Sequence, residues 1–192
     1  MKKSTTRVTV IIVFLVVAVV GYYAYLANRS KSERAEEAMS AVQSILSRDL
    51  SKDYPPTPKE VIKYYNEIFI AYYNEECSEE DIEALGLKAR ELYDDELLEA
   101  NEIGAYLINL QEEVKTGRKN ERRVTSPNVA SSVNVEFFKE DGYDFARLQC
   151  DYVILEAGQK YPTAQMYLLR KDGNKRWKIY GWEDVKKLET QP

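Results

Sequence analysis

Carboxylates are the side chains of this sequence that come closest to catalytic chemistry. Glu136, Asp151 and Glu156 fall in segments where apolar and polar residues alternate. A carboxylate acts as a general base at neutral pH only where burial or a neighbouring charge raises its pKa. Asp151 alternates out of phase with the apolar residues around it, and no acid is clearly in phase with them. The sequence therefore predicts no catalytic residue.

The chain of 192 residues contains no histidine, which narrows the chemistry further. Ser-His and Cys-His nucleophilic pairs and imidazole metal sites are excluded. Cys77 and Cys150 are too few for a cysteine-rich zinc site. They could form a disulfide outside the cytoplasm, or remain two small buried thiols. We expect neither a metal nor a cofactor.

One basic cluster stands out in a segment that is otherwise acidic. After residue 34 the chain has 21 basic and 31 acidic side chains, a net charge of −10, which argues against a nucleic-acid partner. The cluster consists of Lys115, Arg118, Lys119, Arg122 and Arg123. It could meet an anionic polymer or an acidic partner, but a solvated loop is the interpretation we favour.

Residues 8–27, VTVIIVFLVVAVVGYYAYLA, contain no charged side chain. A helix of about 20 apolar residues covers the hydrocarbon core of a bilayer, roughly 30 Å. The run is too long for a secretory signal, so we expect an uncleaved single-pass anchor. Lys2, Lys3 and Arg7 favour a cytoplasmic N-terminal tail over residues 1–7. The sequence therefore predicts a protein of the cell membrane with an extracytoplasmic C-terminal domain.

Residues 28–53 are predicted to form an amphipathic stalk helix or linker. Ala35, Met39, Val42 and Leu46 recur there at helical spacing. This stripe could pair two chains into a homodimer, but it is short for a coiled coil, and packing on its own domain is the favoured interpretation. Residues 54–188 then form one domain, and residues 189–192 a tail.

The first part of that domain has helical patterns and the second part has strand patterns. Capping residues predict helix starts at 57–60, 78–81 and 94–95, with a break near Asn101 and an end at 115–117. Alternation predicts strands at 133–138, 143–156, 161–170 and 176–182, joined by turns at 141–142, 157–158 and 172–173. Helices followed by an antiparallel meander predict an α+β domain with a four-stranded sheet that is packed on one face.

The segment 174–182, Asn-Lys-Arg-Trp-Lys-Ile-Tyr-Gly-Trp, places Trp-x-Ile directly after a turn. This motif and the order of elements over residues 55–185 resemble the nuclear transport factor 2-like (cystatin-like cone) superfamily. The helix start Pro-Pro-Thr-Pro-Lys-Glu resembles uncharacterised membrane-anchored proteins of Gram-positive bacteria. The first resemblance implies a curved sheet that closes over the long helix as a cone. The second implies a location and a fold but no activity.

The interior of such a cone can hold a small ligand. The side chains that we place near it are Tyr65, Phe69, Tyr72, Tyr152, Met166 and Trp177. Aromatic residues at helical spacing form a filled core more often than a pocket, and a filled core is the alternative.

We therefore expect a membrane-anchored, extracytoplasmic module that is not an enzyme and that binds or scaffolds a small ligand or a protein partner. Confinement beside a membrane raises the effective concentration of such a partner. Two alternatives stay open. One is a cone-type isomerase, dehydratase or hydrolase. The other is a single-span subunit of a secretion or conjugation machine, because such subunits of type IV secretion machines also place a cone domain outside the membrane.

Overall fold

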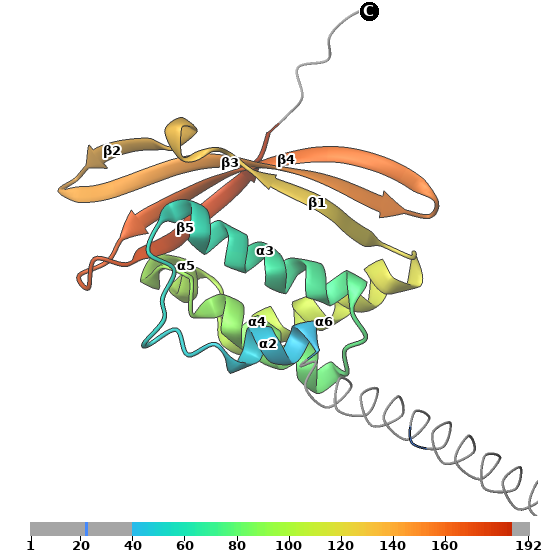
Figure 1. Ribbon diagram of the computed structural model, residues 1–192. Coiled ribbons are helices and arrows are strands. Elements are labelled where there is room, and N and C mark those ends of the chain that lie inside the picture. Colours follow the sequence, from blue (N-terminus) through green and yellow to red (C-terminus); the bar gives the residue numbers. More distant parts are fainter. Residues whose placement is uncertain (1–21, 23–39, 186–192) are drawn as a thin grey trace, which may run out of the picture. The chain divides into compact units, whose positions relative to one another are not determined.

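The computed structural model of the protein describes Tyr22 and residues 40–185. The helices and strands of residues 40–185 belong to one compact unit, Ala41–Pro192. This unit has two layers, an antiparallel sheet and a group of helices that covers only one face of it (Figure 1). The α+β class predicted from the sequence is confirmed.

The helices within residues 40–185 are α2 (Ala41–Ser47), α3 (Pro58–Asn74), α4 (Glu79–Arg90), α5 (Asp95–Ala100) and α6 (Ile103–Lys119). Thr57 caps α3, since its hydroxyl accepts from the Glu60 N–H at 3.2 Å. Ser78 and Asp81 form a reciprocal capping box at the start of α4, and Asp94 caps α5. The three predicted helix starts are confirmed.

Two glycines mark where the helices pack closest. A Cβ atom on Gly86 of α4 would lie 2.6 Å from Leu110 of α6, and one on Gly117 of α6 would lie 2.6 Å from the ring of Tyr73 on α3. Gly117 is therefore needed for close packing and does not end a helix. The predicted end of this helix at 115–117 is wrong, because α6 continues to Lys119.

The sheet is antiparallel and has five strands in the part of the chain that the structure describes. They are β1 (Arg123–Val129), β2 (Glu136–Glu140), β3 (Tyr143–Glu156), β4 (Gln159–Lys171) and β5 (Trp177–Asp184), in the order β1-β3-β4-β5, with β2 also paired to β3. Two-residue hairpins at Asp141-Gly142 and Ala157-Gly158 have positive φ at both positions, as predicted. In the third turn the positive φ falls on Lys175 instead of Gly173.

The predicted four-stranded sheet lacked β1. This strand is interrupted by a register shift between Thr125 and Asn128, where Pro127 has no N–H to donate, so its residues do not alternate regularly. The predicted strand 133–138 is also only partly correct. Its first residues form a 3-10 turn, η1 (Ser132–Asn134), in which the Val133 side chain is 91% exposed.

The buried core lies between the helices and one face of the sheet, which we call the inner face. The phase predicted for β3 is confirmed, because Leu148, Cys150 and Tyr152 are buried there while Asp151 is exposed on the outer face. Val42 and Ile45 of α2 join the same core, so the stripe packs on its own domain as favoured. The packed unit thus begins before the predicted boundary at residue 54.

Both sides of the sheet are bonded by segments outside it. At β1, the Asn74 amide donates to the Val124 carbonyl at 2.8 Å and accepts from the Val124 N–H at 3.0 Å. At β5, the Asp94 N–H donates to the Ile179 carbonyl, and the Ile179 N–H donates to the Leu92 carbonyl. The second pair of bonds holds Tyr93 beside β5.

Among the described residues, none of the helices is both long and apolar enough to cross a membrane. The predicted anchor, residues 8–27, lies outside the described residues except for Tyr22. The predicted tails 1–7 and 189–192, and residues 28–39 of the predicted stalk, also lie outside them.

Candidate functional site

A cavity of about 480 Å³ lies between the inner face of the sheet and helices α3, α4 and α6; we call it the tyrosine cavity. Its aromatic lining consists of Tyr65, Phe69, Tyr72, Tyr73, Tyr93, Tyr106, Tyr161, Tyr167 and Trp182. Such a volume is typical of small-molecule sites, which range from about 300 to 1,000 Å³.

Four of these rings, Tyr65, Tyr93, Tyr167 and Trp182, form one continuous surface that we call the ring wall. The centroid of Tyr65 lies 6.1 Å from Tyr93, 6.0 Å from Tyr167 and 5.9 Å from Trp182. Trp182 also lies 6.0 Å from Tyr93 and 6.1 Å from Tyr167. Tyr93 and Tyr167 are buried, while Trp182 is 41% exposed, so the ring wall reaches solvent at Trp182.

A β-bulge turns Trp182 into the cavity. Leu168 of β4 pairs with Gly181, but the next residue, Leu169, pairs with Ile179, so β5 has one extra residue at Tyr180. The side-chain alternation of β5 is therefore reversed beyond this point. As a result Ile179 and Trp182 both face the helices, although they are three positions apart.

The hydroxyl of Tyr72 has no hydrogen-bond partner among the described residues, although this side chain is only 5% exposed. Burial raises the pKa of Tyr72, with smaller contributions from the nearby Tyr106 and Tyr93, which keeps the phenol protonated. The Tyr106 hydroxyl lies close enough to raise this pKa by weak hydrogen bonding, but it makes no hydrogen bond of ordinary geometry with the Tyr72 hydroxyl. A buried donor without a partner costs about 1–3 kcal/mol. Tyr72 could recover that cost by donating to a bound molecule.

A chain of buried polar groups supports the ring wall from beneath. The Tyr152 hydroxyl lies 2.7 Å from Asn66 Oδ1 and 2.7 Å from the Tyr167 hydroxyl, which lies 2.7 Å from Gln165 Oε1. Asn66 Nδ2 lies 3.3 Å from the sulfur of Cys150. Two hydroxyl protons serve three O···O contacts, and Gln165 Nε2 already donates to Asp184 at 3.3 Å, so the Asn66 amide is the one that must turn its NH₂ group toward Tyr152.

Charged residues surround the opening of the tyrosine cavity. Arg122 binds both carboxylate oxygens of Glu156, at 3.1 and 3.2 Å. Glu113 accepts from the Tyr73 hydroxyl at 3.0 Å and lies 3.6 Å from Arg122. Arg122, and then Asn120, hold the pKa of Glu156 below its ordinary value. With Asp184, the lining contains three carboxylates and one guanidinium, a net charge of −2.

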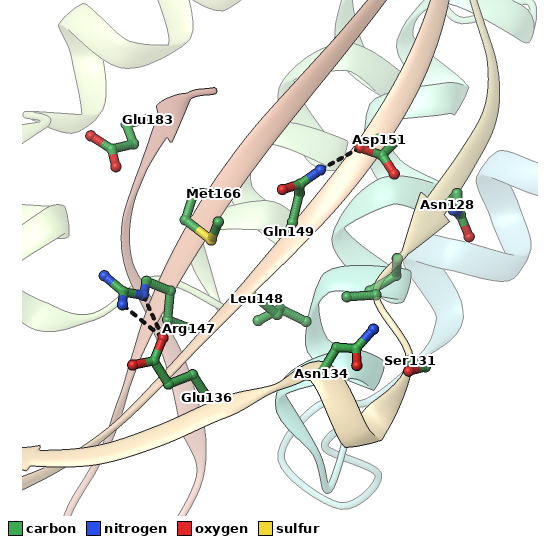
Figure 2. A pocket seen from close by; sticks show the side chains of 12 residues that line it. Asn128, Ser131, Asn134, Glu136, Arg147, Leu148, Gln149, Asp151, Met166 and Glu183 are labelled. Atoms are coloured by element: carbon green, nitrogen blue, oxygen red, sulfur yellow. Dashed lines mark hydrogen bonds and ion pairs between the residues drawn. The ribbon is translucent and has the colours of Figure 1, made fainter. Parts of the chain in front are cut away.

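A second hollow, of about 660 Å³, lies on the outer face of the sheet, where β1 ends and the η1 segment leads into β2 (Figure 2). Four of its polar side chains form two pairs: Arg147 pairs with Glu136 at 2.7 Å, and Gln149 donates to Asp151 at 2.6 Å. Met166 and Glu183 complete its lining. We call this hollow the outer groove.

The structure brings together half of the side chains predicted to line a ligand site. Tyr65, Phe69 and Tyr72 line the tyrosine cavity, and Tyr152 lies beneath its ring wall. Met166 points instead into the outer groove. Trp177 is buried on the inner face away from the cavity, with its ring 5.7 Å from that of Phe137 and 5.1 Å from Lys171 Nζ.

Sequence reasoning missed Tyr93, Tyr106, Tyr167 and Trp182. Regular alternation along β4 could have placed Tyr167 on the inner face with Leu169. Alternation along β5 does not predict the face of Trp182, because the bulge reverses the alternation. Tyr93 lies between helices α4 and α5, where neither a helix nor a strand pattern applies.

The predicted acidic and cysteine residues fall in different places. Glu136 and Asp151 lie in the outer groove, whereas Glu156 lies at the opening of the tyrosine cavity. Cys77 and Cys150 are both free, so the disulfide considered from the sequence is absent between them. Within the described ranges, no group of three or more acidic or cysteine side chains could hold a metal ion.

Two arginines of the basic cluster have structural roles. Arg118 donates to the carbonyls of Tyr72, Glu75 and Cys77 at 2.8–3.0 Å, and so satisfies the C-terminal end of α3 and the loop after it. Arg122 is paired with Glu156 in the same region. The solvated-loop interpretation is therefore wrong for these two arginines, and neither is free to bind an anionic partner.

Comparison with solved structures finds TraH from the Gram-positive conjugative plasmid pIP501, known from an NMR solution structure. The two chains are 16% identical with a TM-score of 0.38, over 68% of this chain and 93% of TraH. This degree of similarity assigns neither a superfamily nor an activity to the chain. No curated protein matches it. The family described as Domain of unknown function (DUF6715) matches residues 1–182, and the chain therefore belongs to that family.

Proposed function

We propose that the chain is a membrane-anchored, extracytoplasmic module that holds a small organic molecule in the tyrosine cavity and catalyses no reaction on it. The observation that carries the proposal is the buried Tyr72 hydroxyl without a partner, in a cavity of ligand size. Native proteins rarely leave such a donor unsatisfied. A bound acceptor would satisfy it.

The ionisation of the lining favours binding over catalysis. Burial raises the pKa of Tyr65 and Tyr93, so these phenols remain protonated donors at neutral pH. Arg122 lowers the pKa of Glu156, which makes this carboxylate a weak base. The cavity thus supplies ring faces and hydrogen-bond donors.

Retention of a ligand tests the proposal directly. The full chain, purified in nanodiscs, is denatured, and the released small molecules are identified by mass spectrometry. Thr163→Trp fills the tyrosine cavity from β4, while Lys160→Trp adds the same ring to an exposed position of that strand. We expect a compound that is retained by the wild type and by Lys160→Trp but lost from Thr163→Trp. Equal amounts from all three proteins, or no compound from any, would contradict the proposal.

We also propose that the domain is a nuclear transport factor 2-like cone and that it lies outside the cell membrane, to which the chain is anchored. A sheet covered by helices on one face only is compatible with a nuclear transport factor 2-like cone, and the 20 uncharged residues 8–27 are compatible with an anchor. Val133 is 91% exposed, so Val133→Cys offers an accessible thiol. In a protein whose free thiols are removed by Cys77→Ser and Cys150→Ala, we expect an impermeant reagent to label Val133→Cys on intact cells and to label Ser4→Cys only after lysis. The reverse pattern would overturn the topology.

A further inference from the structure

Cationic side chains lie over the faces of many rings in this domain. Arg48 lies 4.8 Å from the centroid of Tyr64, and Arg170 lies 4.7 Å from that of Tyr143. The same kind of contact covers Tyr54, Tyr73, Tyr106, Phe138, Trp177 and Tyr180. The four rings of the ring wall have no cation over them from any described residue, although they form the largest cluster of ring contacts in the domain.

The geometry of the ring wall suits a cation that keeps an apolar surface. The planes of its rings meet at 39–71°, so the rings are angled toward one another and not stacked. Trp182, the most exposed of them, offers the ring type that binds cations best. Such rings attract ammonium groups through the negative face of their π-system, and substituents on the ammonium gain contact with the rings.

The net charge around the tyrosine cavity is negative, which suits a cationic ligand. Arg122 is held by Glu156 and Glu113, whereas the structure shows no ion pair for Asp184 among the described residues. Asp184 follows Trp182 by two positions on the same strand, so both side chains lie on the inner face. The Asp184 carboxylate, which accepts from the Gln165 amide at 3.3 Å but has no cationic partner among the described residues, thus lies on the same side of β5 as the Trp182 ring.

We infer that the tyrosine cavity takes a small organic ammonium ion, with the ammonium against the ring wall near Asp184 and a polar atom of the ligand accepting from the Tyr72 hydroxyl. This inference rests on the proposed function and adds the chemical class of the ligand. A bare metal ion does not fit, because the ring wall offers no cage of oxygen ligands to replace its hydration shell. A trimethylammonium group, which is weakly hydrated and apolar at its surface, does fit.

A comparison of choline with its neutral isostere 3,3-dimethylbutan-1-ol tests the inference. The two molecules have nearly the same shape and differ in charge. The full chain is placed in nanodiscs of phosphatidylglycerol, which has no ammonium group, and binding is followed by ligand-observed NMR. We expect choline to bind at least about tenfold more tightly than the isostere.

Two substitutions locate the site, and a third serves as the control. Trp182→Leu should weaken choline binding about tenfold, since it removes the exposed ring. Asp184→Asn should weaken it about threefold without changing the ring wall. Glu183→Gln removes the same charge from the neighbouring residue, which lines the outer groove, and should leave the affinity unchanged.

Several outcomes would overturn the inference. If the isostere binds as tightly as choline, the cavity takes neutral ligands, and the proposed function stands without the ammonium. Equal effects of Asp184→Asn and Glu183→Gln would show a long-range charge effect and no site. If choline does not bind at about 10 mM, the ligand class is wrong, whereas ligand retention still decides the proposed function.

Nanodiscs of phosphatidylcholine distinguish the source of the ammonium group. Weaker choline binding in these nanodiscs would identify a lipid headgroup as the ligand, and unchanged binding would identify a free ammonium compound.

Discussion

The hollows on the two faces of the sheet differ in whether their hydrogen-bonding groups and ring faces already have partners within the protein. The outer groove is the larger, but the polar groups of Arg147, Glu136, Gln149 and Asp151 are bonded in two exposed pairs. The tyrosine cavity is smaller, yet it contains a buried donor without a partner and a wall of four rings that no described cationic side chain covers. An unsatisfied buried hydrogen-bond donor, and not volume, is therefore the reason why we propose the inner hollow as the ligand site.

The sharpest test of this comparison uses two neighbouring residues on opposite faces. Tyr167 is 1% exposed on the inner face, while Met166 is half-buried in the outer groove. Tyr167→Ala should lower the free energy of unfolding by about 3–5 kcal/mol, as for other large core truncations. Met166→Ala should lower it by about 1 kcal/mol. Chemical denaturation measures both, and similar losses would mean that the faces are not differently packed.

The buried polar chain predicts the next largest effect. Tyr152→Phe removes the hydroxyl that links Asn66 to Tyr167 and leaves their groups without this partner. We expect a loss of about 1–3 kcal/mol in the free energy of unfolding. Tyr161→Phe is the matched control, because the Tyr161 hydroxyl is exposed and bonds only Gln159. A loss no greater than that of the control would show that the chain does not stabilise the inner face.

The Arg122–Glu156 pair predicts a smaller effect that depends on pH. The pKa of Glu156 in the folded protein lies below its ordinary value of 4.5, so the pair stabilises the fold above about pH 4.5. This contribution is lost as the pH falls through the lowered pKa. Wild type should therefore be more stable than Glu156→Gln at neutral pH, and the difference should shrink in acid below pH 4.5. A difference that grows in acid would contradict the assignment.

The smallest effect is expected in the outer groove. Arg147 and Glu136 have half-exposed side chains, and pairs of this kind contribute about 0.2–1 kcal/mol. Arg147→Ala should therefore change the free energy of unfolding by less than about 1 kcal/mol and leave choline binding unchanged. Loss of binding in this variant would move the ligand site to the outer face.

Sequence patterns predicted the fold correctly where interactions between residues close in the sequence determine the local structure. The alternation of Leu148, Cys150 and Tyr152 gave the correct face of β3, because each side chain is either in the core or in solvent. Thr57 and Ser78 marked helix starts correctly, since a capping hydroxyl acts within three residues of itself.

The rest depends on contacts between distant residues. Gly117 is a residue type that is common at helix ends. Here a glycine is needed instead because the ring of Tyr73, 44 positions earlier in the sequence, leaves no room for a Cβ atom. Trp182 faces the cavity only because β5 has an extra residue against β4. Strand β1 was missed for a similar reason, because the register shift around Pro127 interrupts the alternation of apolar and polar residues. The face of Met166 was assigned wrongly because that prediction followed a superfamily resemblance and not the pairing of β4 with β3.

The bonds made by Asn74 and by the Leu92–Asp94 segment also bear on solubility. A strand at the margin of a sheet presents free N–H and C=O groups to which another chain can add, and this is a common route to aggregation. Here the Asn74 side chain occupies both groups of Val124, and backbone from the turn after α4 occupies both groups of Ile179. Pro127 removes a further donor from β1. The residues that shape one wall of the cavity thus also discourage the sheet from growing into a fibre.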